Sequence, residues 1–421
     1  YTGPHPSVQV EPAWQNRHMN SVRTLITYDE AIDWIYESWL SARTAVHDIA
    51  ADSHDPRGRD ALTRHPDVTR SLLGMLGGPE RSMQVVNITG SKGKGSTAAI
   101  LASLLDAAGW KTGLFTGPDL VDYSERIHLG GKAIPHEELR RVIAEELLPA
   151  FQQLSFRPPA YASPVGLVLA AALRWFQREA VDVAVLEHGR GARFDDVNQA
   201  RHRYALLTPL MDEHRTELGR TLGSVVWHKS AVLQGAHFAV SAPQSPSVHH
   251  LLERYAQIYG TELEWLGEQV RWRITKATAY QEAPCFDVTT PEARYTRLQA
   301  SSPAVYLAEN AALALRMAEL VLGRPLSQEE ARLGIRRVRL PGRCQILSRE
   351  PLAVVDGAIH PRAAAGVSHL MAAAPRPRAL ILGIPADKEL EGTLTMLSRT
   401  AEIVMITRAT NPHLYFPEDS L

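Results

Sequence analysis

The 421-residue chain has only two cysteines, Cys285 and Cys344, too few for a disulfide framework or a four-thiolate zinc site. We interpret them as incidental thiols in a reducing compartment. An excess of either charge is also missing, since 45 Lys and Arg face 46 Asp and Glu. A protein whose main task is to bind the nucleic acid backbone is normally more basic. The sequence therefore argues against nucleic acid as the main partner.

Long hydrophobic runs are absent as well. The longest apolar stretch, residues 165–173, is far shorter than the roughly 20 residues that span a bilayer. Residues 1–20 lack the basic-then-apolar order of a signal peptide. We therefore expect a cytoplasmic protein without a membrane partner.

The composition, 45% apolar and 22% charged residues, is that of a globular protein. The length suits two or three domains. Residues 1–25 carry no sustained period, so we expect a mobile N-terminal arm. A Ser-Ser-Pro linker ends at Pro303. It places the predicted boundary between a central domain, residues 26–298, and a C-terminal domain, residues 299–421.

The pattern of apolar residues predicts an α/β protein. A buried strand at residues 84–88, a glycine-rich turn, a helix at 96–109 and a strand at 111–115 form a βαβ unit, which implies a parallel sheet. Similar alternation continues to residue 266, and residues 270–297 favour antiparallel strands. Helices and strands recur after residue 303. We predict a P-loop nucleotide-binding domain with a mostly parallel sheet and a smaller, Rossmann-like C-terminal α/β domain, with the chemistry in the crevice between them.

The most informative segment is Gly90-Ser91-Lys92-Gly93-Lys94-Gly95-Ser96-Thr97, between the first strand and its helix. Glycines allow a tight turn in which backbone N–H groups and the helix N-terminus converge on phosphate oxygens. Lys94 would bridge the terminal phosphates and Ser96 would reach Mg²⁺. The spacing departs from the common form, because Ile88 occupies the place of its first glycine and Gly95 precedes Ser96. A merely flexible loop is the alternative, but the flanking strand and helix favour nucleotide binding.

The sequence resembles the Mur ligase superfamily, most closely its folylpolyglutamate synthase branch, as a divergent member. The family loop G-T-N-G-K-G-S-T corresponds to residues 90–97. Further matches follow in one order from residue 28 to 412. They are Phe115-Thr116-Gly117-Pro118-Asp119-Leu120, Glu125-Arg126-Ile127, Glu187 to Asn198, Glu213-His214, Lys229, Asn310-Ala311-Ala312, Leu340-Pro341-Gly342-Arg343, Asp356-Gly357-Ala358 and Asp387-Lys388.

The resemblance implies ATP-dependent amide bond formation through an acyl phosphate. It assigns the nucleotide to Gly90, Gly93, Lys94, Gly95, Ser96, Thr97, Asn310, Arg343 and Asp356. It also implies two Mg²⁺ ions, the first held by Ser96 and Glu187 and the second by His214 and a carbamylated Lys229. The implied catalytic residues are Lys94, His214 and Lys229. Taken singly, each charged residue would be interpreted as a surface group; their order relative to the phosphate loop supports the functional interpretation.

Several motif positions depart from the family. S-P-H-L has become residues 117–120, with Gly117 and Asp119; D-G-A-H-N-P has become residues 356–361, with Ile359 and His360; and Gln345 replaces a glutamate. Because a site that hydrogen-bonds one substrate rejects analogues lacking the group, such changes predict a changed substrate.

We therefore expect a ligase that joins an amino acid or amine, glutamate by default, to a small non-folate carboxylate, as a monomer or small homo-oligomer. A true folylpolyglutamate or dihydrofolate synthase and a non-catalytic nucleotide-binding relative are the alternatives. A P-loop kinase is a third, disfavoured by the second domain.

Overall fold

The computed structural model describes residues 27–51, 55–157, 159–276, 282–358, 360–385 and 389–407. The predicted N-terminal arm and the Asp387-Lys388 pair lie outside these ranges.

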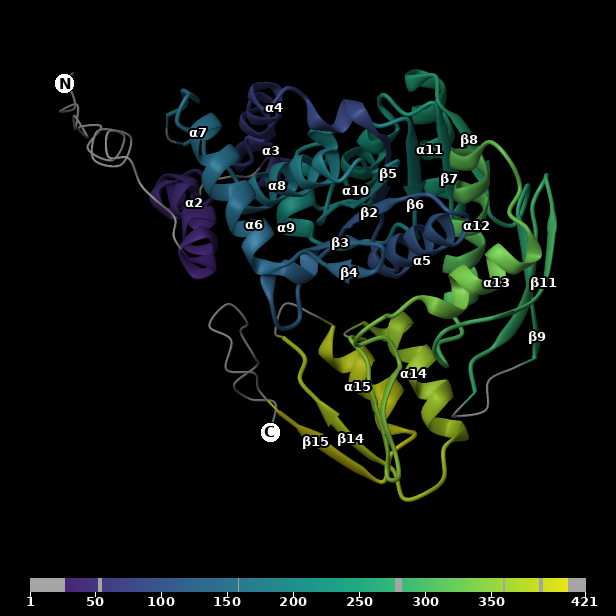
Figure 1. The fold of residues 1–421 in the computed structure, drawn as a ribbon. Coiled ribbons are helices and arrows are strands. Elements are labelled where there is room, and N and C mark those ends of the chain that lie inside the picture. The colour runs from purple at the N-terminus through teal and green to yellow at the C-terminus, as the bar shows by residue number, and fades with distance from the viewer. Residues whose placement is uncertain are drawn as a thin grey trace.

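An eight-stranded sheet in the order β4-β3-β2-β5-β1-β6-β7-β8 forms the centre of the larger part of the molecule (Figure 1). Its parallel strands are β2 (Thr112–Phe115), β5 (Val183–Glu187), β1 (Gln84–Thr89), β6 (Tyr204–Leu207), β7 (Phe238–Ser241) and β8 (Glu262–Trp265). At one edge, β3 (Ile127–Leu129) and β4 (Lys132–Ala133) run antiparallel. The predicted α/β class with a mostly parallel sheet is confirmed.

Helices cover both faces because successive side chains of a strand point to opposite sides of the sheet. Val86 and Ile88 of β1 join a core with α5 (Lys94–Ala107), α12 (Leu307–Leu322) and α13 (Gln328–Arg337). Val85 joins a second core, formed with α2 (Tyr28–Ala51), α4 (Pro66–Met75), α6 (His136–Val142), α7 (Leu148–Phe151) and α8 (Pro164–Arg178). Ala205 and Leu207 of β6 pack with α10 (Leu222–Lys229) and α11 (Pro246–Tyr259) in a third. Two short helices, α3 (Asp60–Thr63) and α9 (Arg215–Leu218), precede α4 and α10 respectively.

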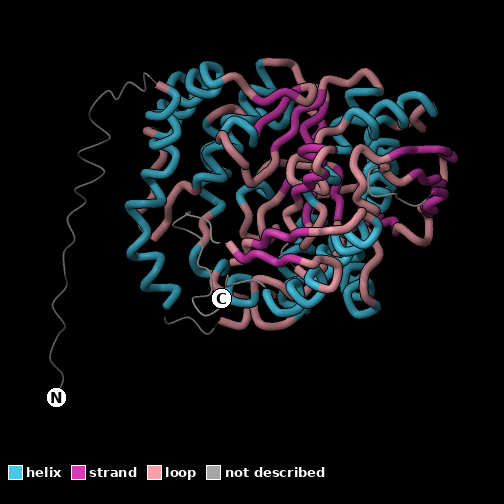
Figure 2. The backbone as a smooth tube through the Cα atoms, turned by 90° about the horizontal axis from the view of Figure 1, so that it is seen from below, coloured by secondary structure: helices cyan, strands magenta, loops and turns pink. Residues whose placement is uncertain are grey.

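Antiparallel strands follow the large sheet, as predicted. They are β9 (Arg271–Lys276), β10 (Cys285–Thr289) and β11 (Arg294–Gln299). The remaining elements form the lower part of Figure 1: a hairpin of β12 (Gln345–Arg349) and β13 (Leu352–Val355), the parallel pair β14 (Ala379–Leu382) and β15 (Ile403–Ile406), and helices α14 (Pro361–Ala373) and α15 (Leu390–Ser398). Figure 2 shows from below how the strands lie among the helices.

Helices α12 and α13 pack against α5 of the large sheet. A Cβ on Gly334 of α13 would lie 2.7 Å from the Cα of Leu104, so only glycine allows this close approach. Residues that follow the proposed linker therefore share a hydrophobic core with the nucleotide loop's helix. The division of the chain at residue 298 stays a prediction.

Candidate active site

The phosphate loop leaves β1 at its carboxyl end and turns into α5. Gly90, with φ +145°, lies so close to Thr208 that a Cβ would overlap its hydroxyl. Gly93, with φ +91°, caps the N-terminus of α5. The first backbone N–H groups of a helix have no intrahelical partner and favour an anion. Lys94 Nζ donates to the carbonyl of Gly90 at 3.2 Å, so its charge lies over the loop.

Glu187 is the last residue of β5. It pairs with Ile88 of β1, and Ile88 precedes Gly90 by two residues. The neighbouring loop after β2 holds its carboxylate: the Thr116 hydroxyl donates to Oε2, and the Gly117 N–H lies 3.3 Å from it. A Cβ on Gly95 would lie 2.9 Å from the same oxygen. Burial raises the pKa of Glu187, and the charge of Lys94 opposes that rise. A buried carboxylate beside the Ser96 turn is a site suited to a cation.

Lys229, at the end of α10, is fully buried beneath the loop. Its Nζ donates to the carbonyls of Gly90 and Arg190, both at 2.7 Å, and lies 3.3 Å from Glu213 Oε1. Burial and then the charge of Lys94 lower the pKa of Lys229 to about 7, whereas Glu213 opposes that shift. A lysine with a pKa near 7 has a substantial neutral fraction and can react as an amine.

His214 follows Glu213 along the chain and is one of the charges that lower the pKa of that carboxylate. It stands at the start of α9 with φ +51°, about one-third exposed, and its Nδ1 lies 4.0 Å from Glu217. Within the described ranges, no group of three His, Cys, Asp or Glu side chains is placed to hold a metal ion. The Ser96 hydroxyl and the Glu187 carboxylate are oxygen donors of the kind that Mg²⁺ prefers. The second predicted set, His214 and Lys229, stays a prediction.

Helix α12 covers the phosphate loop from the other side. Asn310 is buried, and a Cβ on Gly93 would lie 3.0 Å from its Oδ1. Among the described residues, no group accepts from its Nδ2. A buried amide donor costs free energy unless it is hydrogen-bonded, so Asn310 is suited to contact a bound nucleotide.

The C-terminal part supplies the two remaining predicted residues. The charge of Arg343 also opposes the rise in the pKa of Glu187, although less than the charge of Lys94 does. Asp356 accepts from the Cys344 backbone N–H at 2.7 Å and from the Tyr306 hydroxyl at 3.3 Å. Arg343 is therefore close enough to the phosphate loop for its charge to act on Glu187. Asp356 holds the turn that carries Arg343.

Sequence reasoning missed two members of the site, Thr116 and Glu213. Thr116 follows Phe115, which pairs with Leu186 in the adjacent strand, so strand register could have placed it beside Glu187. Glu213 was part of a recognised motif, but only His214 was assigned a role. The order of the motifs gave no signal that the Glu213 carboxylate faces Lys229.

The sequence is similar to those of known proteins over most of its length. The chain is 30% identical over 368 residues to the dihydrofolate synthase/folylpolyglutamate synthase of Escherichia coli, covering 87% of this chain and 80% of that protein. It belongs to the folylpolyglutamate synthase/dihydrofolate synthase family. A second relative, the folylpolyglutamate synthase of Lacticaseibacillus casei, is 26% identical over 353 residues, covering 83% of this chain and 82% of that protein. No protein-family model matches the chain.

Solved structures of family members share the fold. Mycobacterium tuberculosis folylpolyglutamate synthase complexed with ADP matches with a TM-score of 0.76 and 26% identity, over 90% of this chain and 84% of that one. The folylpolyglutamate synthase of Thermotoga maritima matches with a TM-score of 0.74 and 22% identity, over 91% and 87%. The protein is thus an ATP-dependent acid–amino-acid ligase of the Mur ligase superfamily, which releases ADP and phosphate as it forms an amide bond. No helix in the described part of this family member is long and apolar enough to cross a bilayer.

Proposed function

We propose that the protein joins an amino acid, glutamate by the default of its family, to a small carboxylate other than folate. The observation that carries the proposal is the altered segment beside Glu187. Thr116 and Gly117 contact the Glu187 carboxylate, and Asp119, two residues further on, forms an ion pair with Arg126 at 2.6 Å. The family motif has a serine at position 117 and a histidine at position 119. A glycine and a paired carboxylate in their place remove a hydroxyl and an imidazole from the edge of the reaction site.

A second alteration supports the same proposal. Where the family motif has alanine, this chain has Asp196, which is buried and accepts hydrogen bonds from Thr69 at 2.6 Å and from Ser163 at 2.5 Å. Its carboxylate ties the loop after β5 to α4 and to the start of α8. Asp196 does not itself face a substrate, but it changes how this loop is held, so we expect the loop to be shaped for a different acceptor.

The chemistry would follow from the cations around the loop. An acceptor carboxylate oxygen attacks the γ-phosphorus of ATP, the bond to the bridging oxygen breaks, and ADP leaves. The amine then attacks the acyl carbonyl, loses a proton and displaces phosphate. Lys94 and the N-terminal amides of α5 would stabilise charge on the transferring phosphoryl group. Mg²⁺, held by Ser96 and Glu187, would supply further charge neutralisation when bound.

A covalent modification of Lys229 is a further part of the proposal. We propose that its buried amine reacts with CO₂ to form a carbamate, with the catalytic role predicted for it from the sequence. The lowered pKa supports this proposal, because only the neutral amine reacts. The contacts of Lys229 with two carbonyls and Glu213 would have to rearrange, since they suit a hydrogen-bond donor.

A folate substrate is the second candidate function, favoured because the relatives are folylpolyglutamate and dihydrofolate synthases. The test supplies ATP, Mg²⁺ and glutamate with either dihydropteroate, tetrahydrofolate or a panel of other aromatic and aliphatic carboxylates, and measures ADP release together with product mass. We expect dihydropteroate and tetrahydrofolate to give background rates and another carboxylate to give a ligated product. Brisk ADP release with glutamate addition to dihydropteroate or tetrahydrofolate would overturn the non-folate proposal and leave the ligase assignment intact.

A further inference from the structure

The phosphate loop contains a second lysine, Lys92, two residues before Lys94. The Lys92 side chain is 41% exposed, and its Nζ lies 3.9 Å from Oε2 of Glu213, in the segment that follows β6. At 3.9 Å the two groups attract each other by charge, but the distance is too long for a direct hydrogen bond. Because a lysine is a flexible point charge with three donors, Lys92 can exchange this contact for one with a stronger anion.

Three ammonium groups gather around the first residue of the loop. Lys94 Nζ and Lys229 Nζ both donate to the carbonyl of Gly90, at 3.2 and 2.7 Å. Lys229 Nζ also lies 3.3 Å from Oε1 of Glu213, whose other carboxylate oxygen faces Lys92. One carboxylate therefore lies between two lysines, and the third lysine shares a carbonyl with one of them.

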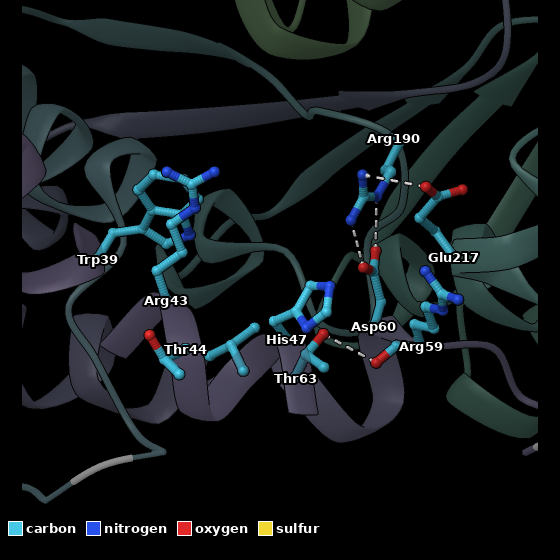
Figure 3. Close-up of a pocket in the computed structure, with 10 residues that line it drawn as sticks. Trp39, Arg43, Thr44, His47, Arg59, Asp60, Thr63, Arg190 and Glu217 are labelled. Atoms are coloured by element: carbon cyan, nitrogen blue, oxygen red, sulfur yellow. Dashed lines mark hydrogen bonds and ion pairs between the residues drawn. The ribbon is translucent and has the colours of Figure 1, made fainter. Parts of the chain in front are cut away.

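The carboxylates in the neighbouring wall balance an arginine. Figure 3 shows Asp60 and Glu217 on either side of the Arg190 guanidinium: Asp60 accepts two hydrogen bonds from it, and Glu217 lies 3.9 Å away. The backbone carbonyl of Arg190 accepts from Lys229, so this wall lies directly beside the three lysines. Its own charges are already paired.

Around the loop itself, the described residues place two carboxylates with the three lysines. Glu213 is one of them, and Glu187 is the other, since a Cβ on Gly95 would lie 2.9 Å from its Oε2. Positive charge therefore exceeds negative charge around the loop of the unmodified chain. A surplus of one sign in such a place attracts a ligand of the opposite sign.

The segment that carries Glu213 is fixed to the loop, so Lys92 lies at the junction of the two. The backbone N–H of Ser91 donates to the carbonyl of Pro209 at 2.9 Å, and the N–H of Met211 donates to Ser91 Oγ at 2.9 Å. Lys92 comes next in the chain, directly before Gly93, which caps the N-terminus of α5. A phosphate on the backbone N–H groups of this helix end would be within the surroundings of Lys92.

We propose that Lys92 is a second phosphate-binding lysine, which leaves Glu213 when ATP binds and contacts the γ-phosphate. A polyphosphate carries more negative charge than one carboxylate and attracts the ammonium group more strongly. Lys92 then holds the γ-phosphate from the side of Glu213 and Lys229, opposite Glu187. When the γ-phosphoryl group has been transferred, ADP no longer offers this contact, so Lys92 returns to Glu213 and ADP is released more readily. The proposal rests on nucleotide binding by the loop, as in the proposed function.

The test compares the binding of ADP with that of AMPPCP, an ATP analogue with a non-hydrolysable β–γ bond. Calorimetry is carried out with Mg²⁺ in bicarbonate-free buffer, so that Lys229 keeps its free amine. K92M removes the ammonium group and should weaken AMPPCP binding about tenfold, the effect of one hydrogen bond between charged groups. Its ADP binding should stay close to that of wild type. K92R keeps the charge and should retain most of the affinity for AMPPCP.

The matched control is K132M, which changes an exposed lysine of β4 and should bind both nucleotides as wild type does. Wild-type affinity of K92M for AMPPCP would overturn the proposal. Equal losses for AMPPCP and ADP would overturn it as well, because Lys92 would then support the loop and not the γ-phosphate. If K92M does not fold, K92Q takes its place with the same expected and contrary results.

Failure of the nucleotide site and failure of the Lys92 proposal give different results. If wild type binds neither nucleotide, the loop is not a nucleotide site and the role of Lys92 falls with it. If wild type binds both nucleotides and K92M binds them equally well, only the role of Lys92 is refuted. The acceptor is absent from the assay, so the non-folate proposal is unaffected by either result.

Discussion

Glu213 Oε1 lies 3.3 Å from Nζ of Lys229, beneath the carbonyl of Gly90 in the phosphate loop. The charges of Lys229 and Lys94 lower the pKa of Glu213 even though burial acts in the opposite direction. Burial in turn lowers the pKa of Lys229 to about 7. The pair thus combines a carboxylate that stays ionised with a lysine that loses its proton near neutral pH.

The proposed carbamylation of Lys229 depends on this proton loss. The neutral amine fraction rises as pH increases through 7, so a carbamate fed by ¹³C-bicarbonate should be more abundant at pH 8 than at pH 6. The measurement is the ¹³C NMR signal of the carbamate, with K229A as the control that lacks it. A signal absent from wild type at pH 8 would contradict the proposed carbamate.

Asn310 should bind nucleotide through its buried, unpartnered amide. N310A removes that donor and should weaken ADP binding about tenfold, the effect of one hydrogen bond to a charged group. N310D should weaken it further, because a carboxylate near Gly93 would repel the phosphates. Calorimetric titration of both variants with ADP tests this order, and equal affinities for N310D and wild type would refute it.

Gly90 should tolerate no side chain. Its φ of +145° and its closeness to Thr208 add steric overlap to backbone strain. G90A should lose about 1–3 kcal/mol or more of stability and lower the melting temperature. Gly109 is the matched control, since its φ is +90° but a Cβ there would meet open space. G109A should be the milder change, and a melting temperature for G90A equal to or above that of G109A would be incompatible with this packing.

Arg316 of α12 is expected to be a strong stability determinant. Its buried guanidinium binds Glu264 of β8 through two 2.7 Å hydrogen bonds and Glu319 at 2.9 Å. R316M would leave two carboxylates without their cation and should cost about 3–5 kcal/mol of unfolding free energy. The control, R324M, removes a more exposed pair with Glu330 and should cost less than about 1 kcal/mol. Denaturant unfolding measures both, and similar losses would argue against a buried network.

The sequence was informative where local chemistry and strand order coincide. The glycines of the phosphate loop and the position of Glu187 at a strand end could be predicted, because a parallel sheet brings the carboxyl ends of its strands to one edge. The pairing of Arg190 with Asp60 could not, because these residues lie on segments that meet only in the folded chain. Glu213 shows the opposite case: the motif match assigned a role to its neighbour His214, and only the folded chain shows that the Glu213 carboxylate lies 3.3 Å from Lys229.

The most direct test of the account is calorimetric binding of ADP, with and without Mg²⁺, to wild type, K94A, E187Q and the surface control K132A. If the phosphate loop, Lys94 and Glu187 form one nucleotide–metal site, K94A should weaken ADP binding at least about tenfold. E187Q should remove the dependence on Mg²⁺, and K132A should behave as wild type. Wild-type affinity and Mg²⁺ dependence in both K94A and E187Q would contradict the account.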